Sequence, residues 1–287
     1  MKDTLHLQNR ELAKYPRTPH LQGSQYQPGD KGAPTPYKDL AGRFLVVEAK
    51  LDGANAAASF SEGAELLLQS RGHYLHLDTL SGRERAFATF KRWGCAHEGR
   101  LLEVLEDRYV MYGEFMHAKH SVYYDALAHV FCEFDIWDRS REVFLDTQGR
   151  HELLAPVPVV SVPVLYAGTA PPRYQDLMEM IAPSVARTRA WRDAFEEEVR
   201  SQGLDLDLCW KQTDRSDLDE GLYIKVEEDG KTVDRYKLVR TDFVQTILDS
   251  GSHHSTRPII PNRLRPGVDI FAPTVDKTWP CANDGRL

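Results

Sequence analysis

The chain has 287 residues, of which 41% are hydrophobic and 28% charged, as in ordinary globular proteins. This length allows one large domain or two modest ones with a substantial core. No apolar run approaches the roughly 20 residues of a membrane helix, and the polar start of the chain lacks the apolar core of a secretion signal. Four cysteines lie far apart with no CxxC pair, which argues against a zinc site and a disulfide framework. We therefore expect a cytoplasmic protein without a membrane partner.

The net charge of -7 weighs against a nucleic-acid partner, because phosphate backbones are usually held by basic surfaces. Charge can still be segregated on a surface. The sequence contains two basic groups, Arg83, Arg85, Lys91 and Arg92 in the first half and Arg257, Arg263 and Arg265 near the end. Each group taken singly is more simply explained as solvated surface charge.

The chain begins with residues 1–43, whose content of Pro, Gly and Gln from residue 15 onward predicts an extended lead-in segment. Regular structure is predicted from Phe44. Apolar runs at residues 44–49 and 66–70, with a turn at 61–63 between them, predict an antiparallel hairpin.

Helices and further strands are predicted in the rest of the chain, up to a Pro-, Arg- and His-rich tail at residues 250–287. Apolar spacing predicts helices at 83–93, at 101–107 and, broken near Pro183, within 174–202. Strands are predicted at 109–115, 130–137, 221–226 and 233–239. The Pro/Val run at 156–163 cannot be a central strand throughout. We therefore place the main folded domain at residues 44–249.

A lysine lies at the end of the first predicted strand, in Glu48-Ala49-Lys50-Leu51-Asp52-Gly53-Ala54-Asn55. Such a lysine can be a nucleophile when burial and neighbouring cations lower its pKa, because the amine must lose its proton to attack. Taken alone, the segment is better explained as a surface Lys-x-Asp-Gly turn. The other motifs of the chain favour the nucleophile instead.

Six short motifs occur in the order found in one enzyme superfamily. They are Lys50-Leu51-Asp52-Gly53-Ala54-Asn55, Ser70-Arg71-Gly72, Tyr112-Gly113-Glu114-Phe115, Glu133-Phe134-Asp135-Ile136-Trp137, Glu220-Gly221-Leu222-Tyr223-Ile224-Lys225 and Tyr236-Lys237-Leu238-Val239-Arg240. Each motif is weak by itself, but six in order are a strong signal. Over residues 44–240 the chain resembles the ATP-dependent RNA ligases, of the phage nick-sealing type, in the covalent nucleotidyltransferase superfamily of DNA ligases, RNA ligases and mRNA capping enzymes.

The resemblance implies catalytic roles for three lysines and a phosphate-binding role for an arginine. Lys50 would attack the α-phosphate of ATP, expel pyrophosphate and hold AMP through a phosphoramide bond. Lys225 and Lys237 would lie on the α-phosphate, where they offset the charge of the transition state and help to keep Lys50 neutral. Arg71 would bind phosphate, since a guanidinium fork matches phosphate geometry.

Further residues would bind the rest of the nucleotide, according to the same resemblance. Glu114 would accept a hydrogen bond from a ribose hydroxyl, and Asn55 would support the ribose and phosphate region. Phe134 would stack on adenine, and backbone groups near Glu48 would select it. In the last motif Val239 replaces the family's second lysine, which leaves open whether Arg240 takes over that phosphate contact.

A divalent cation is expected with ATP. Glu220, with Asp52 as a weaker candidate, would orient Mg²⁺ or Mn²⁺ largely through its waters, because Mg²⁺ keeps much of its hydration shell and prefers hard oxygen ligands. No HExxH helix or cysteine cluster supports a different metal site.

The resemblance also implies the substrate. Asn55 stands where DNA ligases and capping enzymes commonly carry arginine and where the phage nick-sealing RNA ligases carry asparagine. The 47 residues after the last motif, 241–287, are too few for the oligonucleotide-binding barrel that follows the core of DNA ligases and capping enzymes. RNA ends with a 3′-OH and a 5′-phosphate are therefore the expected partners, in RNA repair, at nicks in a duplex or with an accessory protein that presents the ends.

We thus expect an α+β nucleotidyltransferase domain with antiparallel sheets around an ATP pocket and flanking helices. A DNA or mixed-specificity polynucleotide ligase is the main alternative. A capping guanylyltransferase comes next. A non-catalytic nucleotide-binding or nucleic-acid-binding relative is a different class of hypothesis, against which the intact Lys50, Glu220 and Lys237 argue.

Overall fold

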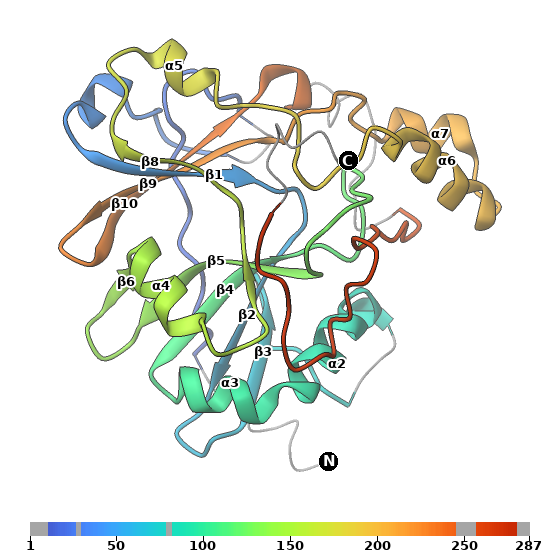
Figure 1. The fold of residues 1–287 in the computed structure, drawn as a ribbon, viewed down its shortest axis with the longest axis horizontal. Coiled ribbons are helices and arrows are strands. Elements are labelled where there is room, and N and C mark those ends of the chain that lie inside the picture. The colour runs from blue at the N-terminus through green and yellow to red at the C-terminus, as the bar shows by residue number, and fades with distance from the viewer. Residues whose placement is uncertain (1–10, 27–29, 79–81, 245–256, 280–287) are drawn as a thin grey trace.

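The computed structural model describes residues 11–26, 30–78, 82–244 and 257–279 and has the predicted α+β fold (Figure 1). Its described strands form one sheet with the order β3-β2-β4-β5-β6-β10-β9-β1-β8, and β7 pairs with β5 off this path. The pairing of β5 with β7 is parallel, and the other strand pairs are antiparallel. No helix among the described residues is long and apolar enough to cross a membrane.

The strands of this sheet are β1 Phe44–Lys50, β2 Ala54–Phe60, β3 Leu66–Ser70, β4 Tyr109–Phe115, β5 Phe131–Asp138, β6 Val143–Leu145, β7 Val160–Ser161, β8 Val164–Thr169, β9 Gly221–Glu228 and β10 Lys231–Val239. The described helices are α2 Ala88–Ala96, α3 Glu98–Leu105, α4 Thr147–Leu154, α5 Tyr174–Met178, α6 Trp191–Ser201 and α7 Leu206–Lys211, with short 3-10 turns η1 Tyr37–Leu40 and η2 Gly82–Phe87.

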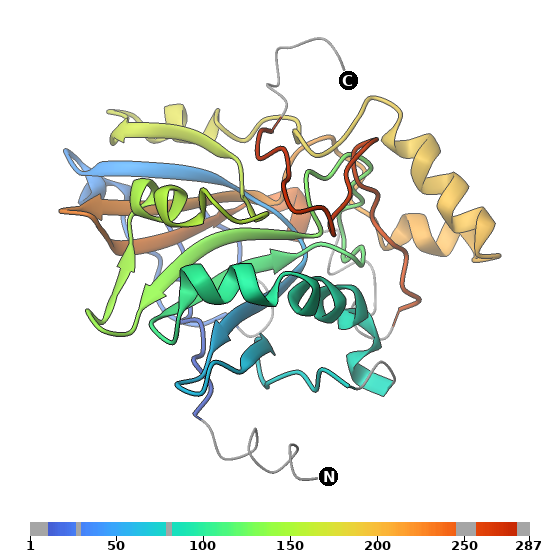
Figure 2. The same cartoon turned by 60° about the horizontal axis from the view of Figure 1, so that its bottom comes forward.

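The sheet is bent into two halves (Figure 1). Strands β3, β2, β4 and β5 form one half, β10, β9, β1 and β8 form the other, and β6 joins them. Helices α2 and α3 pack against β2, β3 and β4 and cover the first half, as the turned view shows (Figure 2). Helices α6 and α7 pack on each other at one side of the molecule (Figure 1).

Hydrophobic patterning explains the strands that the sequence predicts well. In β1, residues 45–49 are buried in succession, because the strand lies between β8 and β9 and is covered on both faces. Strand β4 has the predicted bounds, and β5, β9 and β10 begin and end within two residues of the predictions. The two-residue β7 agrees with the expectation that residues 156–163 are not a central strand throughout.

The predicted hairpin between residues 44–49 and 66–70 is wrong in its pairing. Strand β3 pairs with β2, whereas β1 pairs with β8 and β9. Strand β2 has the sequence ANAAASF, in which alanine and asparagine give little β-propensity, so its pattern does not indicate a strand. Strands β6 and β8 and helices α4 and α7 were also not predicted from the sequence.

The described parts of the two terminal segments pack on the domain. In the first segment, His20 forms a parallel bridge with Lys237 of β10, and the Gln25 amide donates to the Val239 carbonyl at 3.0 Å. In the last segment, the Asn262 amide donates to the His117 carbonyl at 2.8 Å. Residues 257–279 are therefore docked, while the rest of the predicted tail lies outside the described residues.

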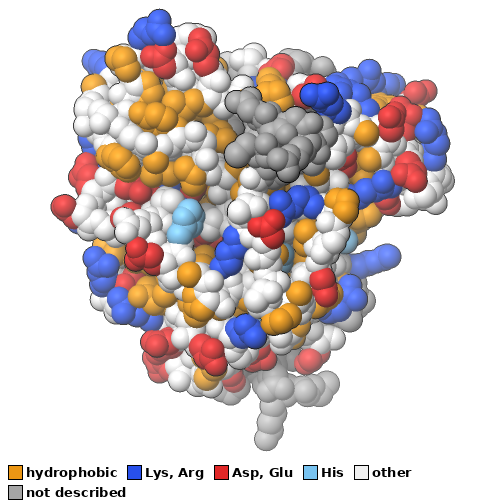
Figure 3. All heavy atoms as spheres, in the orientation of Figure 1, with side chains coloured by type: hydrophobic (Ala, Val, Ile, Leu, Met, Phe, Trp, Pro, Cys, Tyr) orange, Lys and Arg blue, Asp and Glu red, His pale blue; other side chains and the backbone are white. Residues whose placement is uncertain are grey.

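Some members of the basic groups noted in the sequence are engaged in ion pairs. Lys91 is buried and forms an ion pair with Glu84. Arg263 contacts Glu197 at 2.9 Å. On the face shown in Figure 3, basic and acidic side chains are interspersed. A continuous basic band is therefore not visible on that face.

A buried ion network joins the two halves of the sheet. Arg150 of α4 contacts Glu48 of β1 at 2.6 Å and Glu133 of β5 at 2.8 Å, and all three side chains are fully buried. Lys225 of β9 contacts Glu48 at 3.0 Å and Asp135 of β5 at 3.1 Å. Each charge has a partner of opposite sign, which offsets the large cost of removing it from water.

Replacing Arg150 with alanine should lower the free energy of unfolding by about 3–5 kcal/mol, because two buried carboxylates lose a partner. Urea denaturation measures this loss. The matched control is Arg200→Ala, which removes an exposed helical ion pair with Glu196 and should cost less than about 1 kcal/mol. Equal losses in the two variants would contradict the importance of the network.

Candidate active site

A cavity of about 820 Å³ lies at the ends of β1 and β9 and is lined from both halves of the sheet. Its walls come from β1, β2, β3, β4, β5, β9 and β10, together with the first and last described segments. The volume is typical of a small-molecule site. The cavity contains the predicted residues Glu48, Lys50, Asp52, Asn55, Arg71, Glu114, Phe134, Glu220 and Lys237.

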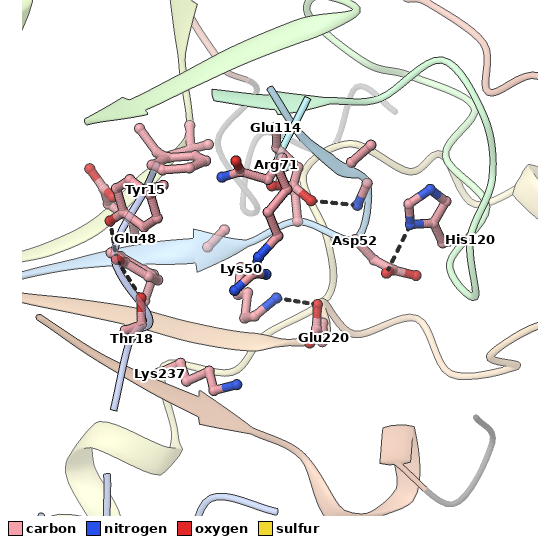
Figure 4. Close-up of a pocket in the computed structure, with 18 of the residues that line it drawn as sticks. Tyr15, Thr18, Glu48, Lys50, Asp52, Arg71, Glu114, His120, Glu220 and Lys237 are labelled. Carbon is pink, nitrogen blue, oxygen red and sulfur yellow. Dashed lines mark hydrogen bonds and ion pairs between the residues drawn. The ribbon is translucent and has the colours of Figure 1, made fainter. Parts of the chain in front are cut away.

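Lys50 lies at the centre of this cavity, against Glu220 (Figure 4). It is the last residue of β1 and lies opposite Gly221 of β9, so the pairing of the two strands brings the two side chains together. The Lys50 ammonium donates to Glu220 at 2.5 Å. Only glycine fits at 221, because an added Cβ would lie 1.9 Å from the Leu238 carbonyl oxygen.

The carboxylates around Lys50 determine its protonation. Burial alone lowers the pKa of Lys50, but the Glu220 and Glu114 carboxylates outweigh burial and raise that pKa above its usual range. The expectation that neighbouring lysines keep Lys50 neutral is therefore wrong for the free protein. Burial raises the pKa of Glu114 to about 7 and that of Glu220 to about 7, against the opposing charge of Lys50.

The Asp-Gly turn after Lys50 anchors a neighbouring loop. One Asp52 oxygen accepts from the backbone amides of Ser121 at 2.7 Å and Val122 at 2.8 Å. The Gly53 amide donates to Glu114 at 3.0 Å. A Cβ on Gly53 would lie 2.7 Å from a backbone oxygen, so glycine is required by this close approach.

Asn55 and Arg71 line the side of the cavity formed by the first half of the sheet. Asn55 of β2 lies opposite Glu114 of β4 in the strand register. Arg71 follows β3 and is exposed at the cavity rim. In Figure 4 its side chain points toward Lys50.

Aromatic and hydroxyl side chains line one end of the cavity. Phe134 is half-buried there and packs edge-on against Tyr15, with 5.1 Å between the ring centroids. The Tyr15 hydroxyl contacts Asp135 and the Tyr223 hydroxyl, and Thr18 contacts the Tyr223 hydroxyl at 3.0 Å. Tyr15 and Thr18 belong to the first segment, which the sequence indicates to be a plain structural segment unless Arg17 or His20 closes over a nucleotide.

Lys237 lines the cavity from β10 and is paired with an acidic residue of the first segment. Its ammonium lies 3.0 Å from Asp30, which also lies 2.8 Å from the His20 ring. His20 is buried and Arg17 is exposed, and neither lines the cavity. The side chains of the first segment that do so are those of Tyr15, Pro16, Thr18 and Asp30.

Two predicted phosphate-binding residues lie outside the cavity wall. Lys225 is two residues beyond Tyr223 on the same face of β9, where it donates to the Phe134 carbonyl and is enclosed by the ion network. Arg240 is buried and pairs with Asp214 at 2.5 Å and Asp242 at 2.7 Å. In this structure both side chains hold the fold together and do not reach the cavity.

Glu48 lines the cavity, but its carboxylate is committed to Arg150 and Lys225. Its carboxylate is therefore not available for adenine, and selection of adenine by backbone groups near Glu48 stays a prediction.

The acidic groups near Lys50 suit a hydrated divalent cation. Among the described residues no group of three or more acidic, His or Cys side chains is arranged to hold a metal by itself. Two acidic side chains, Glu114 and Glu220, nevertheless lie beside the single Lys50 ammonium. Mg²⁺ commonly binds through one or two carboxylates, water and substrate phosphates, so Glu220 fits this ion, whereas one oxygen of Asp52 is taken by two amides.

A family model described as RNA ligase matches residues 43–239, which is more than half of the chain. The chain belongs to the RNA ligase family. This enzyme family is the one that the six motifs predicted. Comparison with curated proteins finds no match.

Solved structures with a similar fold include several of the Naegleria gruberi RNA ligase. A mutant with ATP and Mn is 16% identical with a TM-score of 0.48, over 74% of this chain and 54% of that one. A mutant with AMP and Mn is 15% identical with a TM-score of 0.49, over 82% and 64%. The ligase with PPi is 17% identical with a TM-score of 0.48, over 81% and 62%. The match therefore spans less than two thirds of the length of these chains.

The raised pKa of Glu114 predicts a pH-dependent stability. An acid with a raised pKa binds its proton more tightly in the folded state than in the unfolded state. Protonated Glu114 therefore contributes to the stability of the fold, and this contribution is lost as the pH rises from about 4.5 to about 7. Glu114→Gln should therefore raise the free energy of unfolding relative to the unmodified protein by about 1–3 kcal/mol at pH 8. This advantage should shrink toward pH 5.

Denaturant titrations at the two pH values measure this difference. Glu103→Gln, on the exposed face of α3, is the control and should show no such pH dependence. An equal effect of Glu114→Gln at pH 5 and pH 8 would show that Glu114 titrates normally.

Proposed function

We propose that this RNA ligase is ATP-dependent, stores AMP on Lys50 and seals a 5′-phosphate end of RNA to a 3′-OH end. The observation that carries the proposal is the position of Lys50. Its amine lies in a cavity of nucleotide size that Phe134 also lines, and the cationic side chains of Arg71 and Lys237 flank it in Figure 4.

Three displacements at phosphorus make up the reaction. In the first, the Lys50 amine loses its proton and attacks the α-phosphorus of ATP, which forms the N–P bond and releases pyrophosphate. In the second, a 5′-phosphate oxygen of RNA attacks the same phosphorus, and the Lys50 nitrogen leaves and regains a proton. In the third, the RNA 3′-OH attacks the activated 5′-phosphate, loses its proton and displaces AMP.

The described side chains divide this work. Phe134 offers a ring face to adenine, while Asn55 and Glu114 are placed for the ribose. Lys237 would exchange Asp30 for a phosphate oxygen, and its charge would offset the developing negative charge. Mg²⁺ or Mn²⁺, held near Glu220 and by the phosphates, would supply further charge neutralisation and draw Glu220 away from Lys50.

The RNA substrate is proposed to be a nick or a pair of held ends. Arg263 and Arg265 of the last segment pair with acidic residues, which leaves these two arginines less available to a phosphate backbone. Binding should therefore be modest and salt-dependent. An accessory protein that presents the ends would compensate for this weak binding. The three cysteines that the structure describes, Cys95, Cys132 and Cys209, are free thiols, which suits a cytoplasmic location.

Replacing Lys50 with alanine should abolish the covalent adduct that the protein forms with labelled ATP and Mg²⁺. The adduct of the unmodified protein should be stable to base and labile to acid, as a phosphoramide is. Lys211→Ala, at the exposed end of α7, is the matched control and should label normally. An adduct of equal yield on the Lys50→Ala protein sinks the mechanism, and preferential labelling by GTP would favour a capping enzyme.

Arg71→Ala and Lys237→Ala should fail at different steps. Arg71 lies exposed at the rim, where the RNA end arrives, so Arg71→Ala should form lysyl-AMP but seal nicks at least about tenfold more slowly, the loss of one charge-assisted contact. Lys237 lies inside the cavity, so Lys237→Ala should lose adduct formation itself. Lys231→Ala, at the other end of β10, is the control. Adduct gels and nick-sealing assays separate the steps, and the reverse pattern would refute these roles.

A further inference from the structure

Arg257, in the last described segment, lines the same cavity as Lys50. The Arg257 guanidinium donates to the backbone carbonyls of His120 at 3.2 Å and Gln212 at 3.4 Å. These neutral acceptors orient the guanidinium. Burial lowers its pKa, which the Asp52 charge opposes, but an arginine remains protonated at neutral pH. None of the six motifs includes this residue.

The cavity has two chemically different ends. Figure 4 shows Tyr15 at one side, His120 at the other and Lys50 between them. The Tyr15 end carries the rings of Phe134 and Tyr223 and suits a base, whereas the far end carries His120, Ser121 and Arg257. A nucleotide whose base is held at the aromatic end and whose α-phosphorus meets Lys50 places its remaining phosphates toward the Arg257 end.

Because displacement at phosphorus is in line, the Arg257 end of the cavity would be occupied in both the first and the second step of the reaction. The attacking and leaving groups lie on opposite sides of the phosphorus. Pyrophosphate therefore leaves from the side opposite Lys50 in the first step. The RNA 5′-phosphate must attack from that same side in the second step, because Lys50 is then the leaving group.

We propose that Arg257 forms a phosphate-binding subsite opposite Lys50, which holds the pyrophosphate part of ATP in the first step and the 5′-phosphate of RNA in the second. The proposal rests on the proposed function for its two uses. An arginine suits both ligands, because its planar fork makes paired hydrogen bonds to phosphate oxygens. The neighbouring Asp52 turn, fixed by the Ser121 and Val122 amides, keeps this end of the cavity in place.

Titration with inorganic pyrophosphate tests the subsite without any catalytic step. Calorimetry is carried out on the Lys50→Ala protein, which cannot form or discharge an adduct, with and without Arg257→Ala. The second substitution should weaken pyrophosphate binding at least about tenfold, the loss of one charge-assisted contact, and Arg257→Lys should restore part of it. Failure of the Lys50→Ala protein to bind pyrophosphate, or equal binding with and without Arg257→Ala, would overturn the proposal.

Lys277→Ala is the matched control. Lys277 lies in the same segment and is also held by backbone carbonyls, those of Leu154 at 2.6 Å and Ala155 at 3.0 Å, but it lies outside the cavity wall. Its loss should leave pyrophosphate binding unchanged. Thermal melts of each variant show that it is folded.

A second measurement distinguishes the two phosphate sources. Adenylylated protein, with Lys50 intact, is mixed either with pyrophosphate or with a 5′-phosphorylated RNA, and the loss of label is followed. Arg257→Ala should slow both discharges. Slowing of one alone rejects the shared use and assigns the subsite to that ligand. If no adduct forms on the unmodified protein, the proposed function fails, while the pyrophosphate titration still decides the subsite.

Discussion

The pairing of β1 with β9 is the constraint on which the site depends. It sets Lys50 opposite Gly221, and the absence of a side chain at Gly221 lets β10 approach so closely that a Cβ would meet the Leu238 carbonyl oxygen. Glu220 is thereby fixed 2.5 Å from the Lys50 ammonium. The free protein therefore pairs its central amine with Glu220, and the proposed reaction with ATP requires this pair to be broken.

The two halves of the sheet must keep a fixed separation, because the cavity that contains Lys50 and Glu220 is lined from both of them. The network of Arg150, Glu48 and Glu133 joins them at the base of the cavity, and every member is fully buried. Lys225 completes the network and is a part of the scaffold in this structure. The family resemblance predicts that Lys225 contacts the substrate. In this structure its charge instead holds together the strands that carry Lys50 and Phe134.

The sequence predicts the strands and motifs well where the information is local. Strand β4 and the Lys50 turn follow from residue pattern and motif order. Strand β2 is missed because its alanines carry little strand propensity. Tyr15 is missed because its partner Asp135 lies 120 residues away. Arg240 is predicted at the phosphates but lies outside the cavity. The motif gives its position along the chain and does not reveal its ion pair with Asp214.

We propose that Lys50, and neither of the other two motif lysines, carries AMP. Peptide mapping by tandem mass spectrometry, after incubation of the intact protein with ATP and Mg²⁺, tests it most directly. We expect a single AMP on the peptide that contains Lys50, with the fragment series placing it on that side chain. AMP located on Lys225 or Lys237, or found only as non-covalently bound nucleotide, would contradict it.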